Sequence, residues 1–226
     1  LGESTLSAEE LTSIAGNLAN GAVIDLGEAT FATTEFPMDF ARKTNLQEIA
    51  LPRNIQTFAS EAYSGAFYNC TNLKRVTLPE GLTAIGANCF RQCSQLESIE
   101  LPSSVRTLDI YAFYGCKLLT SVVIPEGVEA IPRFIFDSCT ALTDVTLPNS
   151  VTKIGASAFN GCSLTTINFG QGVKTIENSA FQNCGELTEI ILPDATETLG
   201  QNAFGDCPKL AKISLGKNMK TLEAYC

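Results

Sequence analysis

The sequence contains no histidine and no tryptophan among its 226 residues. Histidine is the usual partner of serine and cysteine nucleophiles and the commonest side-chain ligand of transition metals. Its absence therefore excludes Ser–His and Cys–His catalytic pairs built within this chain. We accordingly predict no catalytic residues, no metal site and no cofactor.

Basic charge and long apolar runs are also scarce. The chain has 15 Lys and Arg against 24 Asp and Glu, a formal net charge of −9. A nucleic acid would have to bind against net repulsion and without a basic stripe, so we exclude it as a partner. No apolar run approaches the length that spans a bilayer, so we expect no transmembrane segment, and the first residues do not resemble a secretion signal.

What the sequence does contain is apolar material in a strict repeat. Hydrophobic residues make up 45% of the chain, enough for a substantial core. Phenylalanine recurs every 23 residues, with one step of 22, at positions 67, 90, 113, 136, 159, 181 and 204. A cysteine follows three residues after each of them, at positions 70, 93, 116, 139, 162, 184 and 207. A period of about 20 to 29 residues is typical of a leucine-rich repeat, in which stacked turns bury a shared core.

Each unit predicts one short strand. In the complete unit from residue 142 to residue 162, alternation at Val145 and Leu147 places both side chains inward, and repetition sets such strands side by side in parallel. Proline follows the strand in most units and can end ladder pairing, whereas Gly170 and Gly216 take its place in two. The predicted fold is an α/β-type repeat solenoid, a right-handed leucine-rich-repeat coil with a parallel β-sheet and few regular helices.

Residues 1–45 differ from the repeats and predict an N-terminal cap. Residues 7–10, Ser-Ala-Glu-Glu, form a capping-box pattern, and Leu11, Ile14 and Leu18 follow at helical spacing. We therefore expect a capping helix at about residues 7–19. A degenerate first turn containing Phe36 and Phe40 then leads into about eight units across residues 46–226, the last of them incomplete.

Three irregularities interrupt the repeat. The first unit is four residues longer than the others around residues 59–65, which predicts an outer loop, and the unit at Cys162 is one residue shorter before Leu164. The final segment, residues 221–226, matches only part of a unit, with Cys226 where Cys89 stands. Either a tail has been trimmed, which we favour, or a parent protein carries more turns or another domain.

The repeat unit Leu-x-x-Ile-x-Leu-Pro-x-x-Val-x-x-Ile-Gly-x-x-Ala-Phe-x-x-Cys-x-x-Leu resembles the BspA-like class of bacterial leucine-rich repeats. The resemblance covers residues 46–226. It implies a secreted or surface-anchored protein, often a lipoprotein, that adheres to host matrix proteins or to other cells. It supplies no catalytic residues and no fixed binding motif.

Nine cysteines in an extracellular protein would ordinarily suggest disulfides. Seven of them share one repeat position, however, so their Cβ atoms should lie about 4.8 Å apart, beyond the roughly 3.5 to 4.5 Å of a disulfide. We predict a ladder of buried free thiols, with Cys89 filling the core. A metal site at Cys89 and Cys93 is rejected because a ladder cannot supply tetrahedral geometry.

Two surfaces are candidates for binding. The outward positions of the strands are small, mixed and nearly free of aromatics. Loops beside the Phe positions of the early units instead gather large side chains, with Tyr63 in the long first unit. The candidate ligand-binding residues are Tyr68, Arg91, Tyr111, Tyr114, Arg133 and Phe134. They form either an interface patch, whose composition they share, or local packing over the insertion.

The acidic residues show no repeated pair of the kind that a glycosidase needs, which argues against an enzyme. We predict a non-catalytic, surface-exposed binding module, engaged in adhesion to a protein or glycan at a cell surface. The alternative is a structural spacer that presents another domain. We expect a monomer, although an uncapped last turn exposes an edge for end-to-end pairing.

Overall fold

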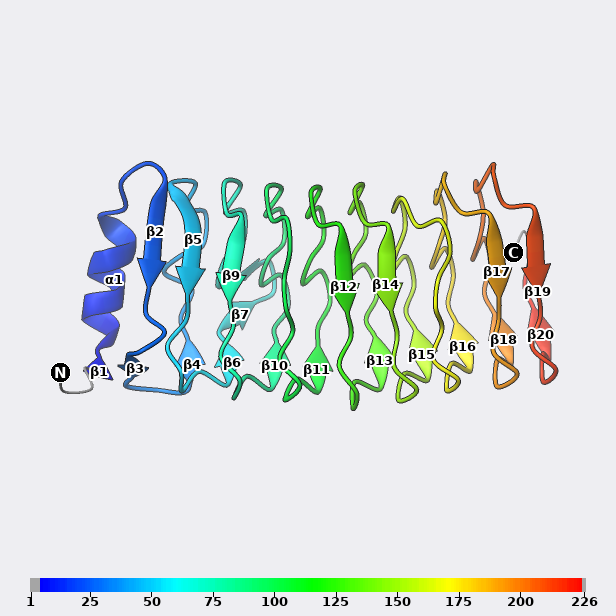
Figure 1. The fold of residues 1–226 in the computed structure, drawn as a ribbon, viewed down its shortest axis with the longest axis horizontal. Coiled ribbons are helices and arrows are strands. Elements are labelled where there is room, and N and C mark those ends of the chain that lie inside the picture. Colours follow the sequence, from blue (N-terminus) through cyan, green and yellow to red (C-terminus); the bar gives the residue numbers. More distant parts are fainter. Residues whose placement is uncertain (1–4, 225–226) are drawn as a thin grey trace.

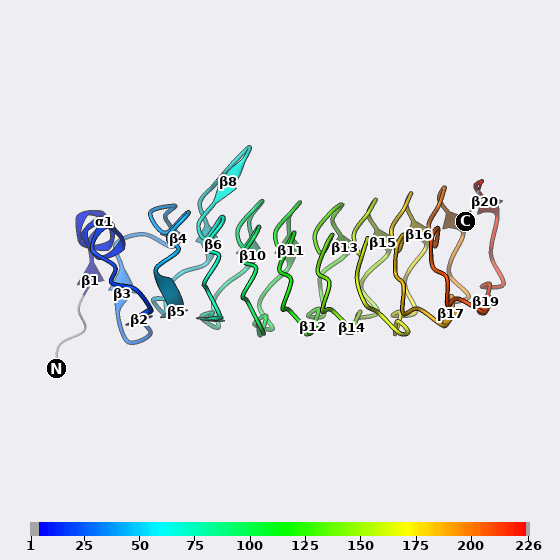
Figure 2. The same ribbon diagram turned by 90° about the horizontal axis from the view of Figure 1, so that it is seen from above.

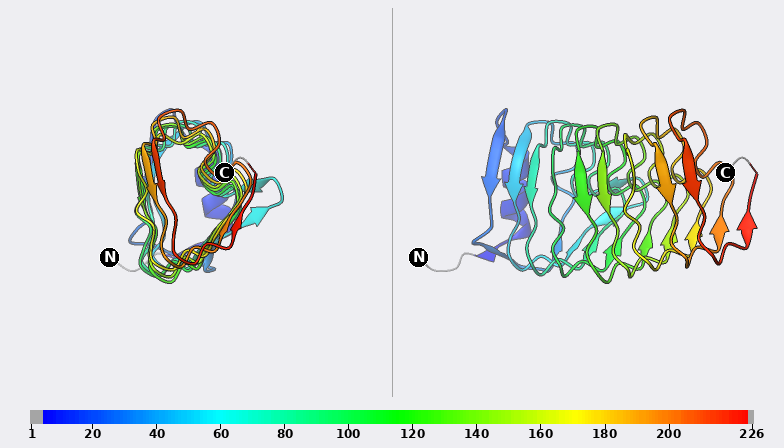
Figure 3. Two further views of the ribbon diagram at one scale, coloured as in Figure 1. Left: turned by 90° about the vertical axis from the view of Figure 1, so that its right-hand side faces the viewer. Right: turned by 45° about the vertical axis from the view of Figure 1, so that its right-hand side comes forward.

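The structure is a computed structural model that describes residues 5–224. The chain winds into a right-handed coil of about nine turns, and the described residues contain one helix. Figure 1 shows the turns stacked along one axis, and the end view in Figure 3 shows them following a common closed outline. The predicted solenoid fold is confirmed. Tyr225 and Cys226, on which the interpretation of the last unit partly rests, lie outside the described residues.

One side of the coil carries the longer strands, which we call the front strands. The front strands are β2 (Ala22–Asp25), β5 (Leu46–Ala50), β9 (Arg75–Thr77), β12 (Ser121–Val123), β14 (Asp144–Thr146), β17 (Glu189–Ile191) and β19 (Lys212–Ser214). In β9, β12, β14 and β17 the central residue is buried, and the two flanking residues are exposed or partly exposed, as the alternation predicted. Pairing is parallel and follows the repeat, with Val122 beside Val145.

In most units a proline ends the front strand, and a two-residue strand of a second row follows it. In the inner turns the second residue of this short strand is buried. Five of these strands form one continuous parallel sheet in the order β13-β15-β16-β18-β20. The row comprises β4 (Glu35–Phe36), β6 (Thr57–Phe58), β10 (Ala84–Ile85), β11 (Thr107–Leu108), β13 (Ala130–Ile131), β15 (Lys153–Ile154), β16 (Thr175–Ile176), β18 (Thr198–Leu199) and β20 (Thr221–Leu222).

After each second-row strand the chain turns and inserts the repeated phenylalanine into the core. Neighbouring rings stack with centroids 5.2 to 5.4 Å apart and nearly parallel planes. Phe36 of the degenerate first turn extends the stack, 5.6 Å from Phe67. We call this set the phenylalanine column: Phe67, Phe90, Phe113, Phe136, Phe159, Phe181 and Phe204. It is the continuous core that no single turn could bury alone.

The cysteines form the predicted ladder. All eight described cysteines are free, and seven of them are buried. Each repeated thiol donates to the backbone carbonyl of a phenylalanine in the preceding turn, as from Cys116 Sγ to Phe90 O at 3.2 Å. Burial raises the pKa of the repeated thiols from Cys70 to Cys162, to about 12 for Cys70 and Cys139. The side chain therefore satisfies a core carbonyl while remaining protonated at neutral pH.

The helix α1 (Ala8–Gly16) lies at the N-terminal end of the coil, beside β2 (Figure 1). Ser7 and Glu10 form the predicted capping box, and Leu11 is buried against the core. The helix ends at Gly16, three residues before the predicted end, because glycine is a poor helix former. The short strand β1 (Thr5–Leu6), just before α1, pairs in parallel with β3 (Thr30–Phe31), which follows β2.

The four extra residues of the first repeat form a hairpin of β7 (Ser60–Glu61) and β8 (Ser64–Gly65), which pair antiparallel. Figure 2 shows this hairpin standing away from the coil. At its base, Gly65 packs so closely on the next turn that a Cβ would lie 2.7 Å from Ala87 O. The predicted outer loop is therefore an ordered projection anchored by a glycine.

Candidate functional site

The turn that leads into the phenylalanine column has an unusual backbone. The residue two positions before the phenylalanine adopts a left-handed conformation in six successive turns. Asparagine tolerates this region better than other residues, whereas a bulky side chain there is uncommon. The six residues, with φ between 52° and 58°, are Asn88, Tyr111, Phe134, Ser157, Ser179 and Asn202.

Two of these six positions carry large aromatic rings. Tyr111 and Phe134 stack on each other, with centroids 5.0 Å apart and planes 6° apart. Tyr114 meets Tyr111 edge to face at 5.7 Å. All three side chains are partly exposed. The repeated backbone thus places the rings of adjacent turns in contact at the surface of the coil.

Arg91 packs its guanidinium against this ring cluster. Its Cζ lies 4.9 Å from the ring centroid of Tyr111, 5.2 Å from that of Tyr114 and 5.9 Å from that of Tyr68. Its Nη1 also donates to Asn88 Oδ1 at 3.1 Å, and Asn88 is only 1% exposed. Cation–π contacts from three rings and one hydrogen bond hold the guanidinium in place.

The structure brings together five of the six predicted site residues, which we call the aromatic corner: Tyr68, Arg91, Tyr111, Tyr114 and Phe134. Arg133 is exposed beside Phe134 in sequence, but among the described residues no ring contact joins it to the cluster. Tyr63 is 82% exposed in the hairpin turn. The rings pack on one another and remain partly exposed, and their role as a ligand-binding patch stays a prediction.

Sequence reasoning missed two members of this site. Asn88 orients Arg91, and Arg42 places its Cζ 5.5 Å from the ring of Tyr68. Arg42 follows Phe40 by two residues, so extending the repeat register into the degenerate first turn could have found it. Asn88 could not have been identified from the sequence, because only the structure shows its left-handed backbone and its contact with Arg91.

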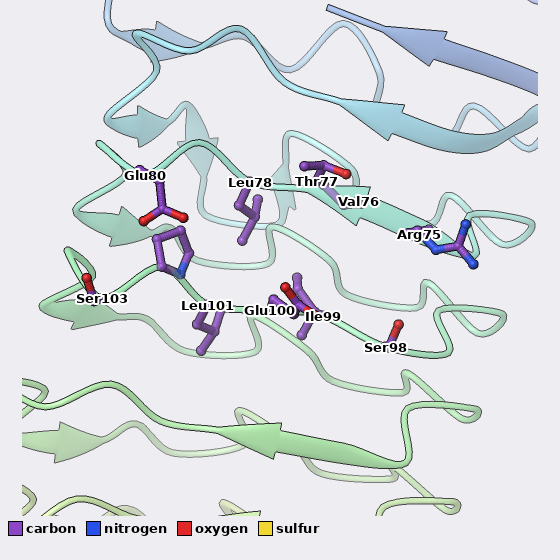
Figure 4. Close-up of a pocket in the computed structure, with 11 residues that line it drawn as sticks. Arg75, Val76, Thr77, Leu78, Glu80, Ser98, Ile99, Glu100, Leu101 and Ser103 are labelled. Atoms are coloured by element: carbon purple, nitrogen blue, oxygen red, sulfur yellow. The ribbon is translucent and has the colours of Figure 1, made fainter. Parts of the chain in front are cut away.

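The front of the coil offers a different kind of surface, a hollow of about 510 Å³ beside β9 (Figure 4). Residues 98–100 of the next turn form no strand, so the front ladder is interrupted there. Arg75 lies at one end of the hollow, with Glu80 and Ser103 at the other. No aromatic side chain lines it, and Arg75 is already paired with Glu48 at 3.1 Å. It lacks the anchors that interface hot spots use.

The described residues contain no group of three or more His, Cys, Asp or Glu side chains that could hold a metal ion. In that same part of the chain, no helix has the length and hydrophobicity to cross a membrane.

The repeats match a known protein-family model over residues 38–140 and 108–226, which together cover most of the chain. That model describes the BspA type leucine rich repeat region, here in six copies. The chain belongs to this family. Its BspA-type repeats are typical of bacterial surface proteins with binding roles and without an enzymatic activity.

Solved structures of other bacterial repeat proteins share the fold. A leucine rich cell surface protein from Faecalibacterium prausnitzii is 26% identical, with 89% of this chain and 71% of that chain covered and a TM-score of 0.55. The leucine rich repeat protein of T. pallidum is 24% identical, with 84% of this chain and 78% of that chain covered and a TM-score of 0.57. A leucine-rich repeat protein from Eubacterium ventriosum is 24% identical over 80% of this chain and 51% of that chain, with a TM-score of 0.61. No curated protein sequence matches the chain.

Proposed function

We propose that this protein is a non-catalytic binding module at the bacterial cell surface, that it adheres to a host or cell-surface protein, and that the aromatic corner is its contact site. The BspA-type repeats support a binding role. A structural relative from Faecalibacterium prausnitzii is described as a cell surface protein, which supports the location.

The observation that carries the choice of site is the left-handed backbone at Tyr111 and Phe134. A side chain larger than glycine costs roughly 1 to 2 kcal/mol in this conformation, and asparagine reduces that cost through local hydrogen bonds. The later turns place Ser157, Ser179 and Asn202 at the same position. Aromatic residues at Tyr111 and Phe134 are less favourable for stability than asparagine would be, and their presence there favours a role in function.

The composition and rigidity of the corner fit the same role. Tyrosine and arginine are enriched among the residues that dominate binding energy at protein interfaces. The rings stand on a coil whose core rings are fully buried, so contacts made there avoid most of the cost of ordering flexible loops.

The test is a binding panel on the immobilised chain, with host matrix proteins and surface glycans as the mobile partners. A Tyr111→Asn/Phe134→Asn variant should weaken binding to its partner by about tenfold or more, while its unfolding free energy stays within about 1 kcal/mol of the wild type. A Val123→Asn/Ile191→Asn variant is the control, because both residues are exposed apolar side chains of the front strands.

Equal loss of binding in both variants would place the contact elsewhere. A large loss of stability in the aromatic variant would assign the rings to local packing. If no member of the panel binds, the spacer interpretation becomes the better one.

A further inference from the structure

Resting on the proposed function, we infer that the aromatic corner recognises a carboxylate on its partner, within an acidic peptide segment, and that the guanidinium of Arg91 is the receptor. Arg42, which packs on the same Tyr68 ring as Arg91, adds positive charge beside it. The inference concerns the chemistry of the partner, which neither the fold nor the family determines.

The first support is a group of cations without carboxylate partners. Of the six arginines in the chain, Arg42 and Arg91 pack on rings of this corner, and Arg133 is next to Phe134 in the sequence. Among the described residues, no carboxylate oxygen lies within 4.0 Å of any of the three. The chain as a whole has a net charge of −9, whereas this group of arginines makes the local charge positive. A locally positive surface attracts an acidic group.

Other cations in the chain do find acids. Arg75 pairs with Glu48 at 3.1 Å, and Lys153 pairs with Glu177 at 2.6 Å. The lysines of the last turn pair likewise with the turn before it. Pairing one turn away thus occurs at six cations of this coil, whereas the corner, like Lys74, Arg106 and Lys117, has no carboxylate oxygen within 4.0 Å of its cations among the described residues.

The second support is the unused hydrogen-bonding capacity of Arg91. A guanidinium carries five N–H donors, and that of Arg91 makes one hydrogen bond, to Asn88. Its Nε is buried without a hydrogen-bond partner among the described residues. The three tyrosine rings and Asn88 fix the group before any ligand arrives, and a fixed guanidinium suits the planar geometry of a carboxylate.

Two acids close in sequence to the rings of the corner are engaged elsewhere. Asp109 accepts the backbone N–H of Ile110 at 2.6 Å, and Asp137 accepts the Ser138 hydroxyl at 2.8 Å and Asn160 Nδ2 at 3.2 Å. Asp137 is only 7% exposed. Neither acid pairs with Arg91, so we expect the carboxylate that Arg91 binds to come from outside the coil.

A peptide is favoured over an acidic glycan because the charges are surrounded by aromatic rings. Rings and arginines together are the composition of protein interfaces, in which the rings supply apolar contact beside the charged pair. At physiological salt, charges beyond roughly 8 Å are screened, so the local arginines outweigh the net negative charge of the chain.

The experiment titrates the purified chain with acetylated, amidated hexaglutamate and with the matching hexaglutamine peptide, by calorimetry. Hexaglutamate should bind at least about tenfold more tightly than hexaglutamine, and its affinity should fall as the salt concentration rises. Equal binding of the two peptides would overturn the inference, as would a preference for an acidic oligosaccharide over hexaglutamate.

Variants separate recognition from structure. Arg91→Lys keeps the charge but loses the planar guanidinium that donates two parallel hydrogen bonds to a carboxylate. It should weaken hexaglutamate binding by about tenfold, whereas Arg91→Gln should abolish binding. Arg75→Gln, on the front strands, should bind as the wild type does. Melting curves of all variants show which of them remain folded, and a folded Arg91→Lys variant with unchanged binding would refute the inference. If a panel partner needs the rings but not Arg91, the proposed function stands and this inference falls.

Discussion

At the scale of single residues, the inner members of the phenylalanine column carry the most tightly constrained packing. Phe113 is fully buried and stacks on Phe90 at 5.4 Å and on Phe136 at 5.3 Å. Each neighbour is held in turn by the next ring and by the backbone of its own turn. A void at this position cannot be filled by movement of one side chain, because every ring belongs to the same stack.

We therefore expect Phe113→Ala to lower the unfolding free energy by about 3 to 5 kcal/mol. Chemical denaturation followed by circular dichroism measures this change. Phe204→Ala is the matched control, because Phe204 stacks on Phe181 at the C-terminal end of the column and is slightly exposed. Phe204→Ala should lower the unfolding free energy clearly less than Phe113→Ala does. Equal decreases at the two positions would show that neighbouring rings on both sides do not raise the cost of the void.

At the scale of elements, the last complete turn is held differently from the inner ones. Within the described residues it contacts only the turn before it, and Leu215 is 47% and Leu222 53% exposed. Charged pairs join it to the turn before, each between residues 23 positions apart. They are Lys209 with Glu186, Lys212 with Glu189, Lys217 with Asp194 and Lys220 with Glu197. Each exposed pair contributes little by itself, but local opening at the end of a coil also takes little free energy.

Acid should loosen this turn before the rest of the coil. Hydrogen bonds from Lys217 and Lys220 lower the pKa values of Asp194 and Glu197. A lowered pKa means that the pairs stabilise the turn above the ordinary carboxyl pKa and lose that effect as the pH falls below about 4. Hydrogen exchange, corrected for intrinsic rates, should show the protection of residues 217–223 falling first between neutral pH and pH about 3.

A Lys217→Met/Lys220→Met variant provides the control for this prediction. Without the two lysines, protection of the last turn should be lower at neutral pH and should change less on acidification. An unaltered pH response in that variant would mean that other groups control the fraying.

At the scale of the whole molecule, the thiol ladder makes stability depend on pH at the alkaline end. Burial is the main cause that raises the pKa of six stacked or neighbouring thiols: Cys70, Cys89, Cys93, Cys116, Cys139 and Cys162. In the unfolded chain these thiols ionise near their ordinary pKa of about 8.5. Between that pH and the raised values, the unfolded state binds fewer protons than the native state, so stability falls as the pH rises.

Each thiol should contribute a slope of about 1.4 kcal/mol per pH unit above about pH 9. Typical domain stabilities of about 5 to 15 kcal/mol would then be lost within one or two pH units, and the reduced protein should unfold near pH 10 to 11. Urea midpoints measured against pH under reducing conditions test this expectation. A Cys116→Ala/Cys139→Ala variant should show about a third less slope, and an unchanged slope would assign the alkaline transition to other groups.

The sequence by itself determined the repeating parts of this protein. The coil, the inward strand residues, the phenylalanine column and the free thiol ladder follow from one pattern that recurs every 22 or 23 residues, because each turn contacts its neighbours at equivalent positions. The capping box and the insertion in the first repeat are likewise local signals. The candidate site residues were also found from sequence, as large side chains at non-core positions.

Only the tertiary structure decided how those side chains meet. The left-handed backbone under Tyr111 and Phe134, and the position of Arg91 between rings of the turns before and after its own, depend on side-chain directions that the repeat does not specify. The interrupted front ladder at residues 98–100 likewise appears only in three dimensions. A periodic sequence fixes contacts between equivalent positions, whereas a site made of unlike residues depends on packing between particular turns.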